Sequence, residues 1–98
     1  MATETSLSIR EWGDATFGEV KDLAALVQRA RGELDELLAA VQAGDKAEIG
    51  REAADVVILL HRLVALAGMD LSEQVDAKMQ VNRGRTWRAA GDGTGGHV

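Results

Sequence analysis

Two long segments of helical periodicity are separated in this chain by only a glycine and an aspartate, Gly44-Asp45. Glycine commonly ends helices, and Asp45 followed by Glu48 has the form of a capping box that starts a new helix. Because the connection is so short, the second helix must return antiparallel to the first. The sequence therefore predicts a helical hairpin at the centre of the fold.

The first segment runs from Glu19 to about Ala43 and carries an apolar stripe. The members of this stripe recur at the spacings of one helix face: Val20, Leu23, Val27, Ala30, Leu34, Leu37 and Val41. A stripe of this kind must pack against other helices.

The second segment runs from Lys46 to about Ala67 and includes an apolar run, Val56 to Leu60. A helix that is apolar on every side is buried on every side. A chain of 98 residues has too few other helices to cover this run, so we expect it to form an oligomer interface. His61 follows the run, and a lone histidine there is more often hydrogen-bonded structure than a ligand. We assign it no catalytic role.

Capping boxes also predict two shorter helices. Ser8 and Glu11 predict a short helix from near Ile9, and Asp70 and Glu73 predict a final helix. The expected fold is all-α: an antiparallel bundle of about four helices, two of them long and central, completed by dimer or tetramer assembly.

We expect one helical domain over residues 8–88. Residues 1–7 are expected to be a flexible N-terminus. Residues 89–98 are too glycine-rich to pack and are expected to be disordered.

Composition excludes several classes of protein. A net charge of −5 argues against a general nucleic-acid-binding protein, which carries a basic surface. We expect no membrane span and no signal peptide, because the apolar runs are short and interrupted and Met1 is followed by polar residues. The chain has no cysteine, which excludes disulfides and thiolate metal sites and fits a cytoplasmic protein.

The central hairpin carries two pairs of acidic residues, Glu33 with Glu36 and Glu52 with Asp55. Residues three apart sit side by side on a helix, so each pair presents two carboxylates on one face. Four carboxylates brought together by the hairpin repel one another unless a cation sits between them, and oxygen ligands suit Mg²⁺. For Asp55 alone, a salt bridge, a helix-edge position and a metal all remain open.

Aromatic residues flank the central helices. Trp12 and Phe17 lie close together near a glycine turn. They form either a hydrophobic lid over one end of the bundle or a wall against which a nucleobase stacks, and both can hold.

Basic and amide side chains follow at helical spacing near the C-terminus, at Lys78, Asn82 and Arg85, in a helix expected from Leu71 to about Asn82. A solvated polar face is one interpretation. Aimed at the carboxylates, the same three side chains would donate hydrogen bonds to a bound polyphosphate.

These motifs, taken in order, resemble the MazG-like all-α nucleoside triphosphate pyrophosphohydrolases. That family is marked by a Glu-x-x-Glu on one helix and a Glu-x-x-Asp on the next, as in Glu33/Glu36 and Glu52/Asp55. The segment around Trp12 and Phe17, and the series Lys78, Asn82, Arg85 and Trp87, are similar to flanking motifs of small members. The resemblance covers nearly the whole chain.

The resemblance implies hydrolysis of a (deoxy)nucleoside triphosphate to the monophosphate and pyrophosphate by a homodimer or homotetramer. It implies Mg²⁺ as cofactor, with Mn²⁺ able to substitute, held by the four carboxylates of the two motifs. One of these carboxylates, or an ion that they hold, activates the attacking water. Lys78, Asn82 and Arg85 are implied to contact phosphate or sugar.

One position departs from the family pattern. Members commonly carry a second glutamate directly before the first motif, where this chain has Gly32. Two alternatives therefore stay open: a helical oligomerisation or regulatory module of the same fold with weak or no catalysis, and phosphoribosyl-ATP pyrophosphohydrolase, which shares the carboxylates and differs in substrate.

Overall fold

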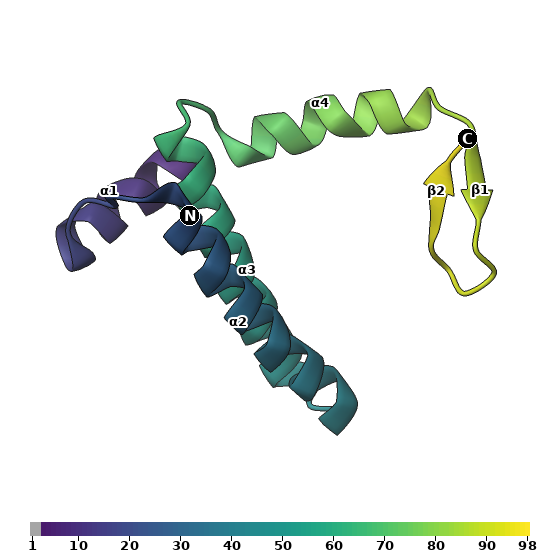
Figure 1. Ribbon diagram of the computed structural model, residues 1–98, viewed down its shortest axis with the longest axis horizontal. Helices are drawn as coiled ribbons and strands as arrows, with labels where there is room; N and C mark the ends of the chain where they lie inside the picture. Colours follow the sequence, from purple (N-terminus) through teal and green to yellow (C-terminus); the bar gives the residue numbers. More distant parts are fainter. Residues whose placement is uncertain (1–2) are drawn as a thin grey trace.

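The computed structural model describes residues 3–98 and consists of four helices followed by a small hairpin of strands (Figure 1). In chain order the elements are α1 (Ser6–Phe17), α2 (Leu23–Ala43), α3 (Lys46–Leu66), α4 (Leu71–Arg83), β1 (Trp87–Ala89) and β2 (Gly95–His97). None of the helices in this described part of the chain combines the length and the apolar character needed to cross a membrane. The predicted all-α architecture is confirmed.

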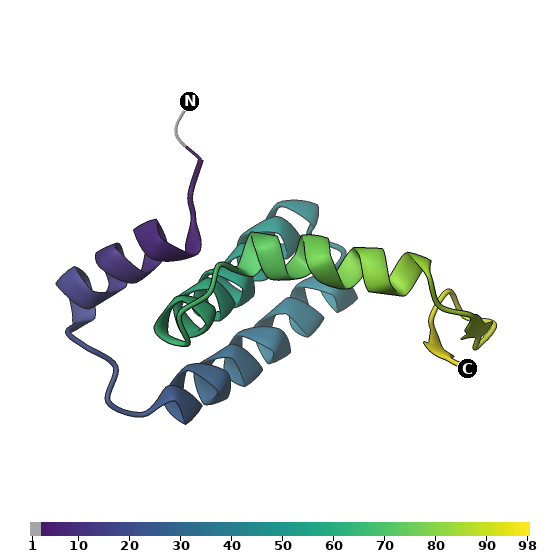
Figure 2. The same ribbon diagram turned by 90° about the horizontal axis from the view of Figure 1, so that it is seen from above.

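The central helical hairpin is also confirmed, with the break at the predicted place. Gly44 ends α2 in the left-handed conformation (φ 70°), which glycine adopts without strain. Asp45 caps α3 by accepting a hydrogen bond from the Glu48 backbone N–H at 3.1 Å. The two helices then run side by side in opposite directions over their whole length (Figures 1 and 2).

The apolar core is small and lies along α3. Helix α2 packs along α3, and α1 packs across the C-terminal half of α3. The buried apolar side chains are Ile9, Leu26, Ala30, Ala40, Val56 and Ala65. Helix α4 has no buried residue and projects away from the other helices (Figure 1).

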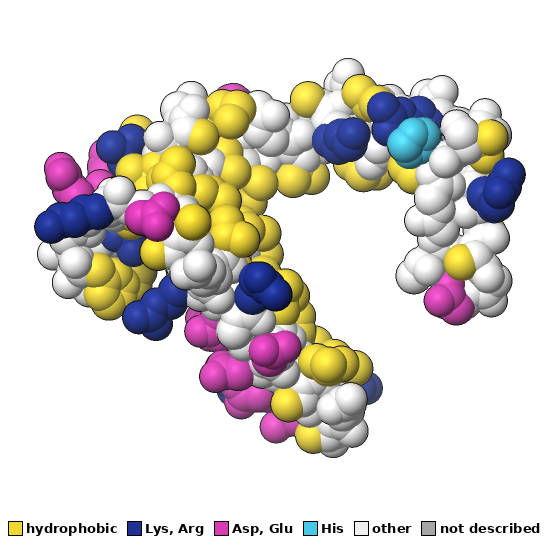
Figure 3. All heavy atoms as spheres, in the orientation of Figure 1, with side chains coloured by type: hydrophobic (Ala, Val, Ile, Leu, Met, Phe, Trp, Pro, Cys, Tyr) yellow, Lys and Arg dark blue, Asp and Glu magenta, His cyan; other side chains and the backbone are white. Residues whose placement is uncertain are grey.

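Much apolar surface stays exposed in a single chain. In the apolar run from Val56 to Leu60, for which an oligomer interface is expected, Val56 is buried while Val57 and Ile58 are exposed. On α2, Leu34 and Leu38 are also exposed. In Figure 3, hydrophobic side chains line the right edge of the α2–α3 pair and the underside of α4. One chain therefore does not cover its own apolar faces, and assembly with further copies stays a prediction.

The N-terminal helix starts earlier than expected. Its cap is Thr5, whose hydroxyl accepts a hydrogen bond from the Ser8 N–H while the Ser8 hydroxyl accepts one from the Thr5 N–H. The prediction of a capping box at Ser8 and Glu11 is wrong, because Ser8 is already the third residue of this helix. A flexible segment was expected over residues 1–7, but the chain is already helical from Ser6, with Thr5 as the cap. Residues 1–2 of that segment lie outside the described residues.

The second helix starts later than expected. It begins at Leu23 instead of Glu19, because Asp22 caps it by accepting a hydrogen bond from the Ala24 N–H. Gly13 does not break α1, and Gly18 ends it with a positive φ of 85°.

A buried hydrogen-bond network joins α1, α3 and the start of α4. Ser6 is 0% exposed, and its hydroxyl accepts a hydrogen bond from the Leu71 N–H (2.7 Å) and lies 2.8 Å from His61 Nδ1. The Ser6 N–H donates to Asp70 (3.1 Å), and this bond, together with one from the Glu73 N–H, lowers the pKa of the Asp70 carboxyl. Although serine, histidine and aspartate meet here, the hydroxyl is buried and already bonded, so it is no nucleophile. The structural role expected for His61 is confirmed.

The C-terminal segment differs from the disorder expected for residues 89–98. Strands β1 and β2 pair antiparallel, with Trp87 opposite His97, and the turn uses positive φ at Gly91 and Gly93. The Trp87 indole N–H donates to the Asn82 carbonyl at 2.7 Å, which ties the strand to the end of α4. The glycines that argued for disorder instead supply the turn.

Candidate active site

Three acidic side chains converge between α2 and α3. Glu33 and Glu36 on α2 and Glu52 on α3 each offer a carboxylate oxygen, and these oxygens all lie within 4.8 Å of one another. The first two residues sit one helical turn apart, and the turn at Gly44 brings the third back against them. This convergence was predicted from the spacing of the two motifs and is observed for these three residues.

The environment of this carboxylate group is unfavourable without a cation. One oxygen of Glu33 and one of Glu52 are buried and have no hydrogen-bond partner. The pKa of Glu52 is raised from 4.5 to about 7, mainly by burial and further by the neighbouring carboxyl groups of Glu48, Glu33 and Glu36. These two buried oxygens have free lone pairs, and the neighbouring groups are also carboxylates, so the site offers only oxygen ligands. Such a site fits a hard divalent cation.

Asp55 lies beside this group without joining it. Its side chain is exposed, and it lines a cavity together with Glu33. Across residues 3–98 the structure records no ion pair for Asp55, so the salt-bridge interpretation has no support within one chain.

The cavity next to the carboxylates has a volume of about 370 Å³ and connects them to the aromatic residues of α1. Its lining comprises Trp12, Phe17, Arg29, Glu33, Asp55, Ile58, Leu59 and Arg62. An apolar pocket with a few convergent polar groups is the usual form of a small-molecule site, for which roughly 300–1,000 Å³ is typical.

Trp12 and Phe17 form one wall of this cavity. Their rings meet edge to face, with centroids 5.6 Å apart and an interplanar angle of 89°. Trp12 is 55% and Phe17 is 70% exposed, so neither ring forms a lid over the chain's own helices. Exposed ring faces beside a carboxylate group fit the nucleobase wall that the sequence offered as one interpretation.

Arg62 is the most informative residue that sequence reasoning missed. It is only 7% exposed, its Nη2 donates to the Gly18 carbonyl (3.1 Å) and lies 3.5 Å from Asp14, and its guanidinium sits 5.6 Å from the centre of the Phe17 ring. The available signal was a charged residue within an otherwise apolar helix segment, since arginine is rarely buried without a partner.

Glu48 and Arg29 were also missed. Glu48 lies one turn before Glu52, and the hydrogen bond from Arg51 (2.8 Å) lowers the pKa of its carboxyl group. Arg29 lies one turn before Glu33 and lines the same cavity. Both could have been found by reading the helix face that continues each acidic motif.

The structure of one chain does not bring Lys78, Asn82 and Arg85 to the carboxylates. The first two lie on α4, which diverges from the α2–α3 pair, and Arg85 follows it (Figures 1 and 2). Within the described part of the chain, no hydrogen bond or ion pair links these three residues to the acidic group. Their contact with phosphate stays a prediction.

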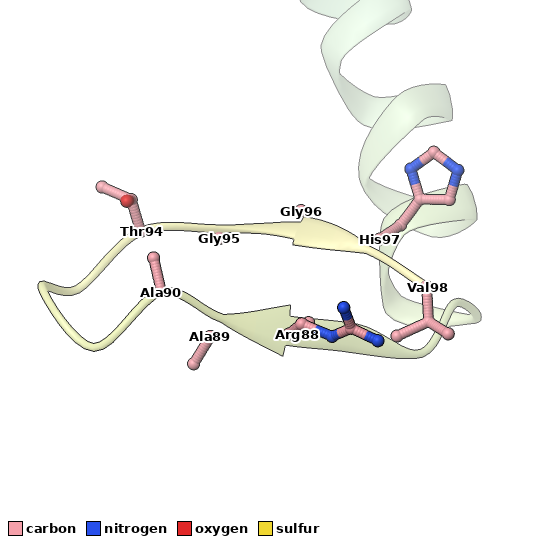
Figure 4. Close-up of a pocket in the computed structure, with 8 residues that line it drawn as sticks. All are labelled: Arg88, Ala89, Ala90, Thr94, Gly95, Gly96, His97 and Val98. Atoms are coloured by element: carbon pink, nitrogen blue, oxygen red, sulfur yellow. The ribbon is translucent and has the colours of Figure 1, made fainter.

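A larger cavity lies elsewhere, against the strand hairpin (Figure 4). It measures about 650 Å³ and is lined by residues 88–90 and 94–98. Its lining contains no Asp or Glu side chain, so it does not offer a divalent cation the carboxylate ligands that the α2–α3 group offers.

Comparison with known proteins agrees with this arrangement. The family model described as phosphoribosyl-ATP pyrophosphohydrolase matches residues 16–83. A dATP/dGTP diphosphohydrolase of Cyanophage S-2L is 39% identical over 66 residues, which are 67% of this chain and 59% of that protein. A dATP/dGTP diphosphohydrolase of Salmonella phage PMBT28 is 37% identical over 92 residues, which are 92% of this chain and 29% of that protein.

This chain thus spans less than two thirds of the length of either curated relative. Among solved structures, the Cyanophage S-2L MazG-like pyrophosphohydrolase bound to dGDP and three catalytic Mn²⁺ ions per active site superposes with a TM-score of 0.75. It is 30% identical, and the match covers 95% of this chain and 88% of that one. The chain therefore belongs to the MazG-like family of all-α pyrophosphohydrolases.

Proposed function

We propose that this protein hydrolyses a (deoxy)nucleoside triphosphate to its monophosphate and pyrophosphate and depends on Mg²⁺, for which Mn²⁺ can substitute. One observation carries the proposal: buried carboxylate oxygens without partners lie beside a cavity with an aromatic wall. The carboxylates suit a cation that neutralises phosphates, and the wall suits a base, so the two ends of one site match the two ends of a nucleotide.

The names of the relatives narrow the range of substrates that we expect. Two of them are named dATP/dGTP diphosphohydrolases, and the solved relative carries dGDP and Mn²⁺. We therefore expect purine deoxynucleoside triphosphates to be the best substrates.

Each side chain has a role in this scheme. Glu33, Glu36 and Glu52 hold the cation, and Asp55 completes its ligand set from the cavity side. A divalent cation in this group supplies charge stabilisation for the phosphates and a bound water of lowered pKa. One of these carboxylates, or the cation that they would hold, activates the attacking water, while Trp12 and Phe17 stack on the base.

We propose further that the working unit is a homodimer or homotetramer. The exposed apolar faces of α2 and α3 require cover, and α4 needs a packing partner. In such an assembly, Lys78, Asn82 and Arg85 of one copy reach the phosphates held by the carboxylates of another.

A second activity is favoured by one observation. The matching family model is that of phosphoribosyl-ATP pyrophosphohydrolase, whose substrate carries the same polyphosphate chemistry on a modified adenine nucleotide. The carboxylate group serves both reactions, so only the base end of the site distinguishes them.

The test is pyrophosphate release from the ribo- and deoxyribonucleoside triphosphates and phosphoribosyl-ATP, each with and without Mg²⁺. We expect metal-dependent release, with monophosphate as co-product, and the highest kcat/KM on dATP or dGTP. Activity on phosphoribosyl-ATP alone would establish the second candidate. A folded protein that releases no pyrophosphate from any of them would leave the non-catalytic module, with Gly32 as its first explanation.

A further inference from the structure

We propose that Arg62 recognises the base of the substrate by donating a hydrogen bond from Nη1 to N7, the acceptor that adenine and guanine share. This inference rests on the proposed function and adds to it the residue that selects purines.

Arg62 is fixed in place from three sides. Nη2 is bonded to the Gly18 carbonyl and paired with Asp14, and the Phe17 ring lies against the guanidinium. On the remaining side, Nε packs so tightly against α1 that a Cβ added at Gly13 would overlap it. A side chain held in this way is pre-organised, so a ligand that it contacts loses little binding energy to ordering it.

One donor of the guanidinium is left over. Nε is buried and without a partner, and Nη2 is used by Gly18 and Asp14. Nη1 takes part in no hydrogen bond with any residue of 3–98 and is not among the buried atoms, while Arg62 itself lines the cavity. Nη1 is therefore the donor of Arg62 that is free for a ligand in the cavity, which Trp12 and Phe17 also line.

The surroundings suit a neutral base better than a phosphate. Asp14 already pairs with the positive charge of Arg62, and the guanidinium lies against Phe17 at the aromatic end of the cavity. The cation that phosphates require belongs to the group of Glu33, Glu36 and Glu52, which does not include Arg62. A base stacked on Trp12 or Phe17 would turn an edge toward Arg62.

A single N–H donor discriminates in a definite way. Adenine and guanine both present N7 as an acceptor, whereas at position 6 adenine carries a donor and guanine an acceptor. A donor aimed at N7 accepts both purines, and pyrimidines have no ring nitrogen there. The same contact thus accounts for a site that takes dATP and dGTP alike.

The experiment compares kcat/KM of the wild-type protein for dATP and 7-deaza-dATP, with 3-deaza-dATP as the matched control. Losing a hydrogen bond to a charged donor should lower kcat/KM about tenfold or more for the 7-deaza analogue. The 3-deaza analogue, which keeps N7, should be hydrolysed nearly as well as dATP. Equal rates on dATP and 7-deaza-dATP would overturn the inference, and so would hydrolysis of pyrimidine nucleotides but not of dATP. No hydrolysis of any nucleoside triphosphate would instead refute the proposed function.

Two variants complete the test. Arg62→Gln should lower kcat/KM for dATP and abolish the difference between dATP and 7-deaza-dATP. Arg29→Gln removes another arginine of the cavity and should preserve that difference, whatever it does to KM. If Arg62→Gln retained the 7-deaza penalty, Arg62 would be only a support for α1, and the inference would fail; the wild-type comparison stands even if this variant does not fold.

Discussion

Glu52 shows at the scale of one residue how folding and chemistry oppose each other in this site. Packing α3 against α2 removes one of its oxygens from water and sets its carboxyl group among those of Glu33, Glu36 and Glu48, so its pKa rises to about 7. Near neutral pH this residue is therefore half protonated when no cation is present. A divalent cation shifts the protonation equilibrium of Glu52 toward the ionised form, because it binds that form.

The first prediction concerns stability. The pKa of the Glu52 carboxyl group is higher in the folded chain (about 7) than in the unfolded chain (4.5). Its contribution to the stability of the fold is therefore complete below pH 4.5 and is lost as the pH rises through about 7. Without divalent cations, the melting temperature should therefore fall between about pH 5 and pH 8, and Mg²⁺ should restore it at the upper end far more than at the lower. Thermal unfolding with chelator or Mg²⁺ measures this.

The carboxyl groups with lowered pKa values do not obscure that window. The pKa values of Glu48, Asp70 and Asp92 are all lowered, so the stability that they contribute is lost only in more acidic solution. Glu52→Gln is the matched control, since it keeps the shape and cannot ionise. A variant with the same fall in melting temperature as wild type would show that another group is responsible.

The second prediction concerns activity. Glu52→Gln and Asp55→Asn should each reduce turnover about 100-fold or more, because both keep the volume of the side chain and remove its charge. Circular dichroism and thermal unfolding should show that both variants stay folded. Full turnover by Asp55→Asn would exclude Asp55 from the ligand set and leave Glu33, Glu36 and Glu52 to hold the cation alone.

Among the helices, replacing two glycines by alanine should change the stability of the fold in opposite directions. Helix propensity alone favours alanine by up to about 1 kcal/mol at either place. At Gly32 in α2 an added Cβ meets nothing within 4 Å, so Gly32→Ala should stabilise by roughly that amount. At Gly13 in α1 the added Cβ overlaps the guanidinium of Arg62, so Gly13→Ala should destabilise by roughly 1–3 kcal/mol.

Chemical denaturation of both variants measures the contrast. If Gly13→Ala were also stabilising, Arg62 would move aside freely and α1 would not be clamped to α3 as the hydrogen bonds to Gly18 and Asp14 indicate. Gly32→Ala serves as the control because it makes the same chemical change in open space.

The elements also show what the sequence could and could not predict. The α2–α3 hairpin and the meeting of Glu33, Glu36 and Glu52 depend on local signals, namely helix period, motif spacing and one glycine turn. The clamp between Arg62 and α1 depends on contacts between residues more than forty positions apart, which no local pattern encodes. The start of α1 was misplaced because two capping patterns overlap at Ser8 and only tertiary burial of Ser6 decides between them.

For the whole molecule, we propose that the working unit is an assembly of more than one copy of the chain. Helix α4 has 13 residues, none of them buried, and isolated helices of about 12–15 residues or fewer are only marginally stable in water. It exposes Val75 and Met79, while the α2–α3 pair exposes Leu34, Leu38 and Val57. In the proposed assembly, packing these faces against those of a second copy would cover both and would bring the polar residues of α4 toward the carboxylates of that copy.

The last prediction tests this arrangement by mixing inactive subunits. A Lys78→Ala/Arg85→Ala protein keeps its carboxylates, and a Glu52→Gln protein keeps its α4 donors, so each alone should be nearly inactive. If α4 serves the site of another copy, a mixed dimer contains one intact site. Random mixing of the two should then recover about a quarter of wild-type turnover, because about half of the dimers are mixed.

The outcome is read from co-refolded proteins that carry different tags, so that mixed assemblies can be isolated and their size measured by analytical ultracentrifugation. Recovery of turnover in the mixed fraction, and none in either parent, places α4 in the site of another copy. Mixed oligomers without recovery would contradict that placement, because a donor on α4 that served its own chain would be missing wherever the carboxylates are intact. A monomer at working concentrations would contradict the assembly itself and leave the apolar faces of α2, α3 and α4 for a different protein to cover.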